Sequence, residues 1–368
     1  MSALLSFRRS GLTIARFKDI PVTIGYSWFL LAVLIIALYA PIVAGRVADA
    51  SNLVAYAYAA LFAVMLLTSV FLHELGHALT ARHYRIGVRS ITLDALGGFT
   101  EMDREAPKPG QAALIALAGP AVSAVLGILF LLLTRVGDPG TLTWLLALQM
   151  AVANLLVAAY NLLPGLPLDG GKAVQSAIWS ATKNEWTGYS VAGWIGRGVA
   201  VLTGLAGMWL YFQELYSVFG LVLMLLVAVE LWRGAGASIE FSRRGETVRG
   251  LKARELARPI ELVAADRPLG EALAAAEGRI MVVVADSKPV GIVDEAAAAA
   301  VEPERVDHIG LEGLMHPAGA IPPVEASLEG RELLRSLSQR GSDYYWVLDG
   351  DQLAGVLRAD DVVAALQG

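Results

Sequence analysis

The sequence contains no cysteine, only five histidines in 368 residues, and few charges, with 17% of residues charged against 56% hydrophobic. Without cysteine there are no disulfides, no cysteine zinc or iron–sulfur ligands and no thiol catalysis. A soluble domain carries about 25% charged residues, so this composition argues against a single soluble domain. The net charge is −5 and the basic residues are scattered, which argues against nucleic acid as a partner.

The few charges are divided unevenly along the chain. Residues 1–233 carry 15 Lys and Arg against 12 Asp and Glu, whereas residues 234–368 carry 14 against 22. An apolar, slightly basic first part and an acidic, ordinarily polar second part predict a membrane domain followed by a soluble domain.

Six apolar stretches are long enough, or nearly so, to cross a bilayer, which takes about 20 residues. Buried core helices of a soluble protein are the alternative, but six of this length would leave little polar surface. The basic residues before the first stretch resemble a signal peptide, yet its apolar run is too long for one, so we expect it to stay as an anchor. The stretches are 21–44, 53–80, 111–134, 142–163, 188–212 and 215–232.

The basic residues of the short connections predict the orientation of these spans. If the N-terminus is cytoplasmic, eleven Lys and Arg lie on the inside, and only Arg46 and Arg135 lie outside. We therefore expect a multi-pass protein of the cell membrane, in contact with membrane lipid, with both termini and the soluble domain in the cytoplasm.

The second stretch ends in the sequence His73-Glu74-Leu75-Gly76-His77. Two histidines four residues apart lie on one face of a helix and can bind one metal ion, with the glutamate beside them as general base. Two ordinary histidines near the membrane surface are the alternative. Ionisable groups are costly within a span, and this favours a functional site.

A catalytic zinc ion takes a third protein ligand and leaves one position open. The second and fourth spans run in the same direction, so Asp169, just after the fourth, lies at a depth comparable to that of the histidines. A helix-capping role in a Pro/Gly turn fits Asp169 equally well. The rival candidates are Asp94, Glu101 and His83, the last being off the ligand face.

Three separated motifs together resemble the site-2 protease family of intramembrane zinc metalloproteases. They are the His73–His77 motif, Ala118-Gly119-Pro120-Ala121, and the Asn161-xx-Pro-xx-Pro-Leu-Asp-Gly-Gly segment that ends at Gly171. Their order and spacing are those of the family, and the match covers most of residues 1–233.

The resemblance implies one Zn²⁺ ion held by His73, His77 and Asp169, with Glu74 activating a water molecule. It also implies that Asn161 assists the scissile carbonyl or its oxyanion. The expected substrate is a transmembrane protein segment, which must unwind locally because a helix hides its carbonyls in its own hydrogen bonds.

The segment Ala95–Met102 is similar to a Gly-Gly strand region near the active site in this family. Gly97 and Gly98 would then position an extended substrate that adds to a strand edge. A plain hairpin turn is the alternative. In the fifth span, Gly188, Gly193, Gly196 and Gly198 fit either a mobile gate or close helix packing.

Residues 246–368 contain an internal repeat, in which the strands around Gly291 and Gly355 align 64 residues apart. Each unit has the order helix, strand, helix, strand, strand, helix, and is too small to bury a core alone, so the two units should pack together. This pattern resembles a tandem pair of CBS domains, a regulatory module that often binds adenine nucleotides and allows a homodimer. Of the family's nucleotide-binding positions only Asp361 fits, so packing alone is the alternative.

The expected fold class is therefore an α-helical polytopic membrane domain of about six transmembrane helices followed by a soluble α+β CBS-like pair. The expected boundaries are a cytoplasmic segment 1–20, a protease domain 21–233, a linker 234–245, and repeats 246–301 and 302–368. The predicted function is intramembrane metalloproteolysis. The alternatives are a zinc-binding transporter or channel gated by the pair, and an inactive helix-binding relative.

Overall fold

The structure is a computed structural model that describes residues 11–46, 51–95, 97–139, 141–286 and 288–367. Arg8 and Arg9, which the orientation argument counts, lie outside the described residues. The chain forms two compact units, Met1–Ser242 and Arg243–Gly368. The division falls within a helix, and each unit is described separately.

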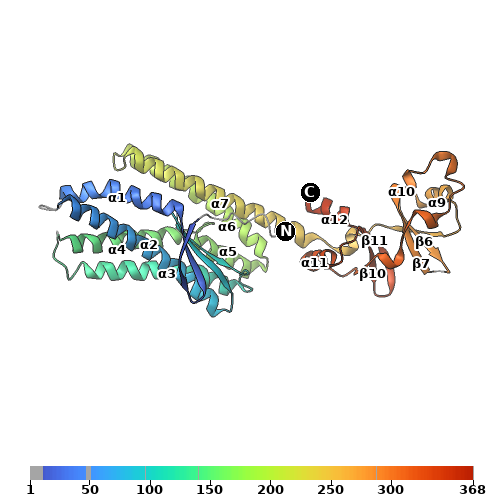
Figure 1. Cartoon of the computed structure of the whole chain (residues 1–368), viewed down its shortest axis with the longest axis horizontal. Coiled ribbons are helices and arrows are strands. Elements are labelled where there is room, and N and C mark those ends of the chain that lie inside the picture. Colours follow the sequence, from blue (N-terminus) through green and yellow to red (C-terminus); the bar gives the residue numbers. More distant parts are fainter. Residues whose placement is uncertain (1–10, 47–50, 96, 140, 287, 368) are drawn as a thin grey trace. The chain divides into compact units, whose positions relative to one another are not determined.

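Six helices of the first unit, among the described residues, are long and apolar enough to cross a membrane. Many of their large apolar side chains are exposed, as expected for helices that face lipid. The six predicted spans are therefore confirmed as helices, and α1 to α4 run side by side (Figure 1). The helices are α1 (Tyr26–Arg46), α2 (Asn52–His83), α3 (Pro109–Leu133), α4 (Leu142–Asn161), α6 (Glu185–Phe212) and α7 (Val218–Gly250).

Three segments differ from the expectation. Residues 21–25, assigned above to the first span, belong to β2 (Ile20–Gly25), which forms a hairpin with β1 (Gly11–Phe17). The Pro/Gly segment after α4 leads into a further helix, α5 (Asp169–Thr182). Residues 234–245, expected as a linker, continue α7 without a break.

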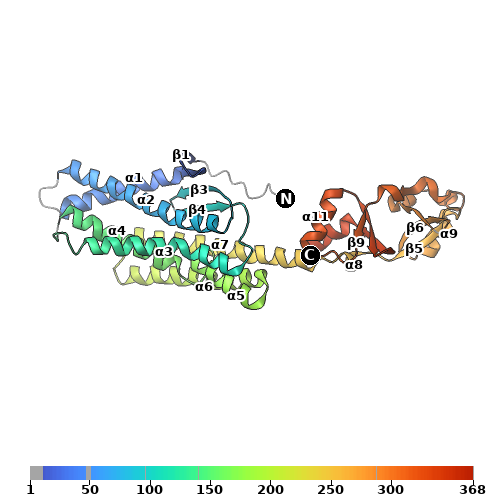
Figure 2. The same ribbon diagram turned by 90° about the horizontal axis from the view of Figure 1, so that it is seen from below.

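A four-stranded sheet of order β1-β2-β3-β4 lies beside the last turns of α2. Its remaining strands are β3 (Val88–Asp94) and β4 (Gly97–Met102), and β4 lies at one edge. Ile20, Val22, Ile91 and Leu93 bury their side chains against Ala78 of α2. This apolar contact fixes the sheet next to the part of α2 that carries the two histidines (Figure 2).

In the second unit the first repeat has the predicted order of elements, whereas the second begins with a 3₁₀ turn and contains one additional strand at Met315–Pro317. The first repeat contains α8 (Ala253–Leu256), β5 (Ile260–Ala264), α9 (Leu269–Ala276), β6 (Ile280–Ala285), β7 (Lys288–Val293) and α10 (Glu295–Ala299). The second contains a 3₁₀ turn (Leu311–Leu314), β8 (Met315–Pro317), β9 (Pro323–Glu325), α11 (Gly330–Arg340), β10 (Tyr344–Asp349), β11 (Gln352–Arg358) and α12 (Ala359–Gln367).

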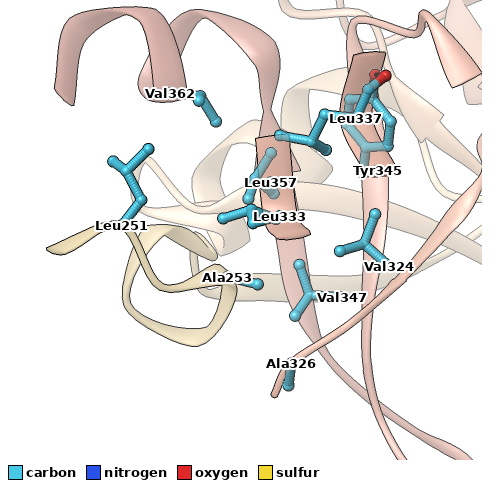
Figure 3. Close-up of a cluster of buried hydrophobic side chains, with 10 residues drawn as sticks. All are labelled: Leu251, Ala253, Val324, Ala326, Leu333, Leu337, Tyr345, Val347, Leu357 and Val362. Atoms are coloured by element: carbon cyan, nitrogen blue, oxygen red, sulfur yellow. Dashed lines mark hydrogen bonds between the residues drawn. The ribbon is translucent and has the colours of Figure 1, made fainter. Parts of the chain in front are cut away.

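The two repeats share a core. Ile280, Val282 and Ile292 of the first repeat pack with Trp346 and Val356 of the second. The repeats also exchange backbone pairing, because β8 joins β7 of the first sheet and Arg258 pairs with Val356 of the second. A further core cluster joins α8 and the preceding Leu251 to the second repeat (Figure 3). The expected packing of the two repeats is confirmed.

Candidate metal centre

His73, Glu74 and His77 lie in the last third of α2 with buried side chains, at 5, 6 and 6% exposure. One donor atom from each residue lies within 4.8 Å of the other two. The i, i+4 spacing brings the two imidazoles onto one face of the helix, where their rings meet edge to face at 5.0 Å. The helical geometry thus assembles this cluster from a local sequence motif.

Asp169 is the first residue of α5, and its side chain lies beside the two histidines. Its Oδ2 lies 3.2 Å from His73 Nε2 and 3.2 Å from His77 Nε2. The N-cap of α5 is Leu168, which makes no side-chain capping bond, so Asp169 does not serve as the N-cap. Two nitrogen donors and one carboxylate oxygen therefore converge on one point, which fits the donor set that catalytic zinc prefers.

The other nitrogen of each imidazole is bound by α3. His77 Nδ1 lies 2.7 Å from the carbonyl oxygen of Ile115, and His73 Nδ1 lies 2.9 Å from Ser123 Oγ. A carbonyl only accepts, so the neutral His77 ring donates from Nδ1 and directs the lone pair of Nε2 toward Asp169. In metal sites, hydrogen bonds of this kind to the second ring nitrogen fix the orientation of imidazole ligands.

Gly119 of α3 leaves space directly beside the Nε2 atoms of His73 and His77. A Cβ atom at this position would lie 2.3 Å from His77 Nε2 and 2.6 Å from His73 Nε2. The absent side chain therefore opens the volume that an ion would occupy, which is a second observation that fits a metal.

Strand β4 holds the Glu74 carboxylate. The Thr100 hydroxyl donates to Glu74 Oε2 at 2.7 Å, and a Cβ on Gly98 would lie 2.2 Å from Glu74 Cγ. The sequence did not predict the roles of Thr100 and Ser123, because each side chain contacts a residue that lies far from it in the chain. Gly97 has φ of +133°, a conformation that favours glycine.

Lys172 adds a positive charge one turn further along α5, with its Nζ 3.5 Å from Asp169 Oδ1. Burial would raise the pKa of the Asp169 carboxyl, but the adjacent histidines and the charge of Lys172 lower it overall. The centre therefore keeps Asp169 as a carboxylate, the form in which it can bind a cation.

Comparison with known proteins finds a family that matches part of this chain. The model of the family described as "Peptidase family M50" matches residues 61–139, which include His73, Glu74, His77 and Gly119. Over this segment the chain is similar to peptidase family M50.

Relatives of this chain are named as metalloproteases. A Synechocystis protein named as a zinc metalloprotease is 29% identical over 98% of this chain and 97% of its own length. The zinc metalloprotease MJ0392 of Methanocaldococcus jannaschii is 27% identical over 84% of this chain and 85% of its own. The family match and the names of these relatives support a metalloprotease.

Two solved structures are similar to parts of this chain. The site-2 protease from Methanocaldococcus jannaschii is 26% identical and covers 62% of this chain and 95% of its own, with a TM-score of 0.45. The CBS domain of a bacterial CNNM/CorC family Mg²⁺ transporter in complex with ATP is 18% identical and covers 34% of this chain and 94% of its own, with a TM-score of 0.28.

The other candidate ligands, Asp94, Glu101 and His83, make contacts outside this cluster. Asp94 accepts from Ser27 at 3.0 Å, and Glu101 lies 3.6 Å from Arg89. The ring of His83 packs on Tyr84. Asn161, at the end of α4, donates from Nδ2 to Val157 O at 3.0 Å, so its amide is engaged within its own helix in this structure.

In the second unit, Asp361 forms a two-pronged ion pair with Arg258. The distances are 2.7 Å from Arg258 Nε to Oδ2 and 2.6 Å from Nη2 to Oδ1. This hydrogen bonding raises the pKa of Arg258. The carboxylate expected to bind a nucleotide is therefore bound to a residue of the other repeat.

Proposed function

We propose that this protein hydrolyses peptide bonds in or near transmembrane segments of membrane proteins, with one zinc ion held by His73, His77 and Asp169. The observation that carries the proposal is the convergence of the three donor atoms at 3.2 Å inside a buried, helical centre. A metalloprotease whose centre lies in a candidate span acts on a substrate within the membrane.

When bound, zinc polarises a carbonyl and lowers the pKa of a coordinated water molecule to about 7. Glu74 is the general base: its carboxylate takes a proton from water and returns it to the leaving amine. Thr100 and Gly98 position that carboxylate, and Ser123 and Ile115 keep the two imidazoles turned toward the ion. Asn161 supports the scissile carbonyl after its amide leaves Val157.

The edge of β4 is the proposed position of the substrate chain. Because β4 ends the sheet, it offers backbone groups to an added strand, and an unwound substrate would recover its hydrogen bonds there. Gly97 and Gly98 lie at the start of this strand, and Gly98 faces Glu74. An added strand would therefore pass close to the general base.

The membrane placement and the role of the second unit are part of the proposal. The basic residues of the short connections favour a protein of the cell membrane with cytoplasmic termini. The second unit acts as a CBS-like regulatory pair that binds an adenine nucleotide through Asp361 and allows a homodimer. Because Asp361 is bound to Arg258, nucleotide binding would compete with this ion pair.

The proposal is tested with purified protein, a model transmembrane substrate and zinc analysis. Chelation should abolish cleavage, and added zinc should restore it. Asp169→Ala should lower both zinc content and cleavage. Cleavage that persists without zinc, or a full zinc content in Asp169→Ala, would refute the proposed centre.

A further inference from the structure

An open pocket of about 340 Å³ lies where α2 ends. It is lined by Lys18 and Asp19 of the β1–β2 turn, by Arg82 and Arg85 at the end of α2, and by Asp103 after β4. Since α2 is long and apolar enough to cross a membrane and ends at His83, the pocket is expected near a membrane surface. Lipid headgroups are found at this depth.

The charges of the pocket favour an anion. Asp103 is already bound to Arg89 at 2.8 Å, which leaves three cations against Asp19. Among the described residues, no carboxylate lies within ion-pair distance of Lys18, Arg82 or Arg85. Arg82 Nη1 donates to the Lys18 carbonyl at 2.7 Å, which ties the end of the helix to the turn.

The backbone of the pocket gives a second, independent argument. Lys18, Asp19 and Arg85 have φ of 44°, 71° and 58°, the left-handed region that favours glycine. Three of the seven such non-glycine residues in the described chain line this one pocket. The sequence therefore keeps charged side chains here at positions where the backbone favours glycine, as occurs at functional sites.

We propose that this pocket binds the phosphate group of a phospholipid headgroup through Lys18, Arg82 and Arg85. Guanidinium and ammonium groups form charge-assisted hydrogen bonds with phosphate oxygens. A bound headgroup would hold the β1–β2 turn against the helix that carries His73 and His77.

The test compares two glycine variants of the purified full-length protein in detergent. Arg85→Gly removes a cation of the pocket, and Lys183→Gly removes one at the end of α5, outside the pocket, where φ is also 58°. Both should keep or raise the melting temperature, because glycine suits this conformation. Only Arg85→Gly should weaken the binding of phosphatidylglycerol, by about tenfold, as measured by native mass spectrometry.

Competition with sn-glycerol 3-phosphate distinguishes the source of the phosphate. If it does not displace the lipid at millimolar concentration, the ligand is the phospholipid, and if it does, a free phosphate ester satisfies the same site. Wild-type affinity in Arg85→Gly would overturn the proposal. An equal loss of affinity in Lys183→Gly would also overturn it, because it would show an effect of total charge.

Discussion

At the scale of single residues, the centre depends on two glycines as much as on the residues whose side chains form it. Gly119 leaves the volume in front of His73 and His77 open, and Gly98 leaves room for Glu74. Neither role follows from the sequence, because each is a contact between elements. The His73–His77 motif could be predicted because its geometry is local to one helix.

The role of Asp169 could be predicted only in part from the sequence. Its depth relative to the histidines could be estimated from the direction of the spans, but a ligand and a helix cap fitted the sequence equally well. The structure places its carboxylate at 3.2 Å from both Nε2 atoms. Thr100 and Ser123 carry no signal in the sequence, since a single threonine or serine is common in any strand or helix.

Gly119→Ala should expel the metal. Its Cβ would lie 2.3 Å from His77 Nε2, so the histidines must move or lose the ion, and we expect zinc content and cleavage to fall together by at least about tenfold. Gly110→Ala in the same helix is the control, because nothing lies within 4 Å of its Cβ. Normal zinc content in Gly119→Ala, measured by elemental analysis, would contradict this account of the centre.

At the scale of secondary structure, the long apolar helices could be predicted and the shorter elements could not. The residues of β2 are apolar and run directly into α1, so hydropathy assigned them to the first span. Helix α5 begins Asp-Gly-Gly, which is typical of a turn, and its packing against α6 stabilises it. The order of elements in the first repeat could be predicted because the pattern occurs twice in the sequence, whereas β8, which pairs with β7 of the first repeat, could not.

In α6, Gly188, Gly193 and Gly196 lie close to neighbouring elements, which favours a packing role for these glycines. A Cβ on Gly196 would lie 1.9 Å from the Leu166 carbonyl oxygen, in the loop that leads to Asp169. Gly196→Ala should therefore lower the free energy of unfolding by about 1–3 kcal/mol, seen as a lower melting temperature. Gly198→Ala, with nothing within 4 Å, should melt like the wild type, and equal melting temperatures of the two variants would favour the mobile gate instead.

Strand β4 gives the prediction for substrate docking. Proline removes a backbone donor and blocks an added strand, so Phe99→Pro should lower cleavage at least about tenfold while zinc is retained. The control is Ile14→Pro in β1, at the opposite edge of the sheet, where the pairing register shifts between Thr13 and Ala15. Wild-type cleavage by a folded Phe99→Pro variant would exclude docking at this edge.

At the scale of the whole molecule, the absence of cysteine becomes an experimental advantage. Asp138→Cys between α3 and α4, and Ser327→Cys in the second unit, introduce single thiols at exposed positions. In intact cells, a membrane-impermeant maleimide should label Asp138→Cys, and should label Ser327→Cys only after permeabilisation. The reverse pattern would invert the proposed orientation.

The central claim is that Glu74 is the general base beside a zinc ion held by His73, His77 and Asp169. The most direct test measures zinc content and cleavage of a transmembrane substrate in wild type and Glu74→Gln side by side. The account predicts one zinc ion in each protein and a loss of cleavage of at least about a hundredfold in Glu74→Gln, since general-base catalysis contributes about 10²–10⁴-fold. Cleavage at the wild-type rate by zinc-loaded Glu74→Gln would contradict it.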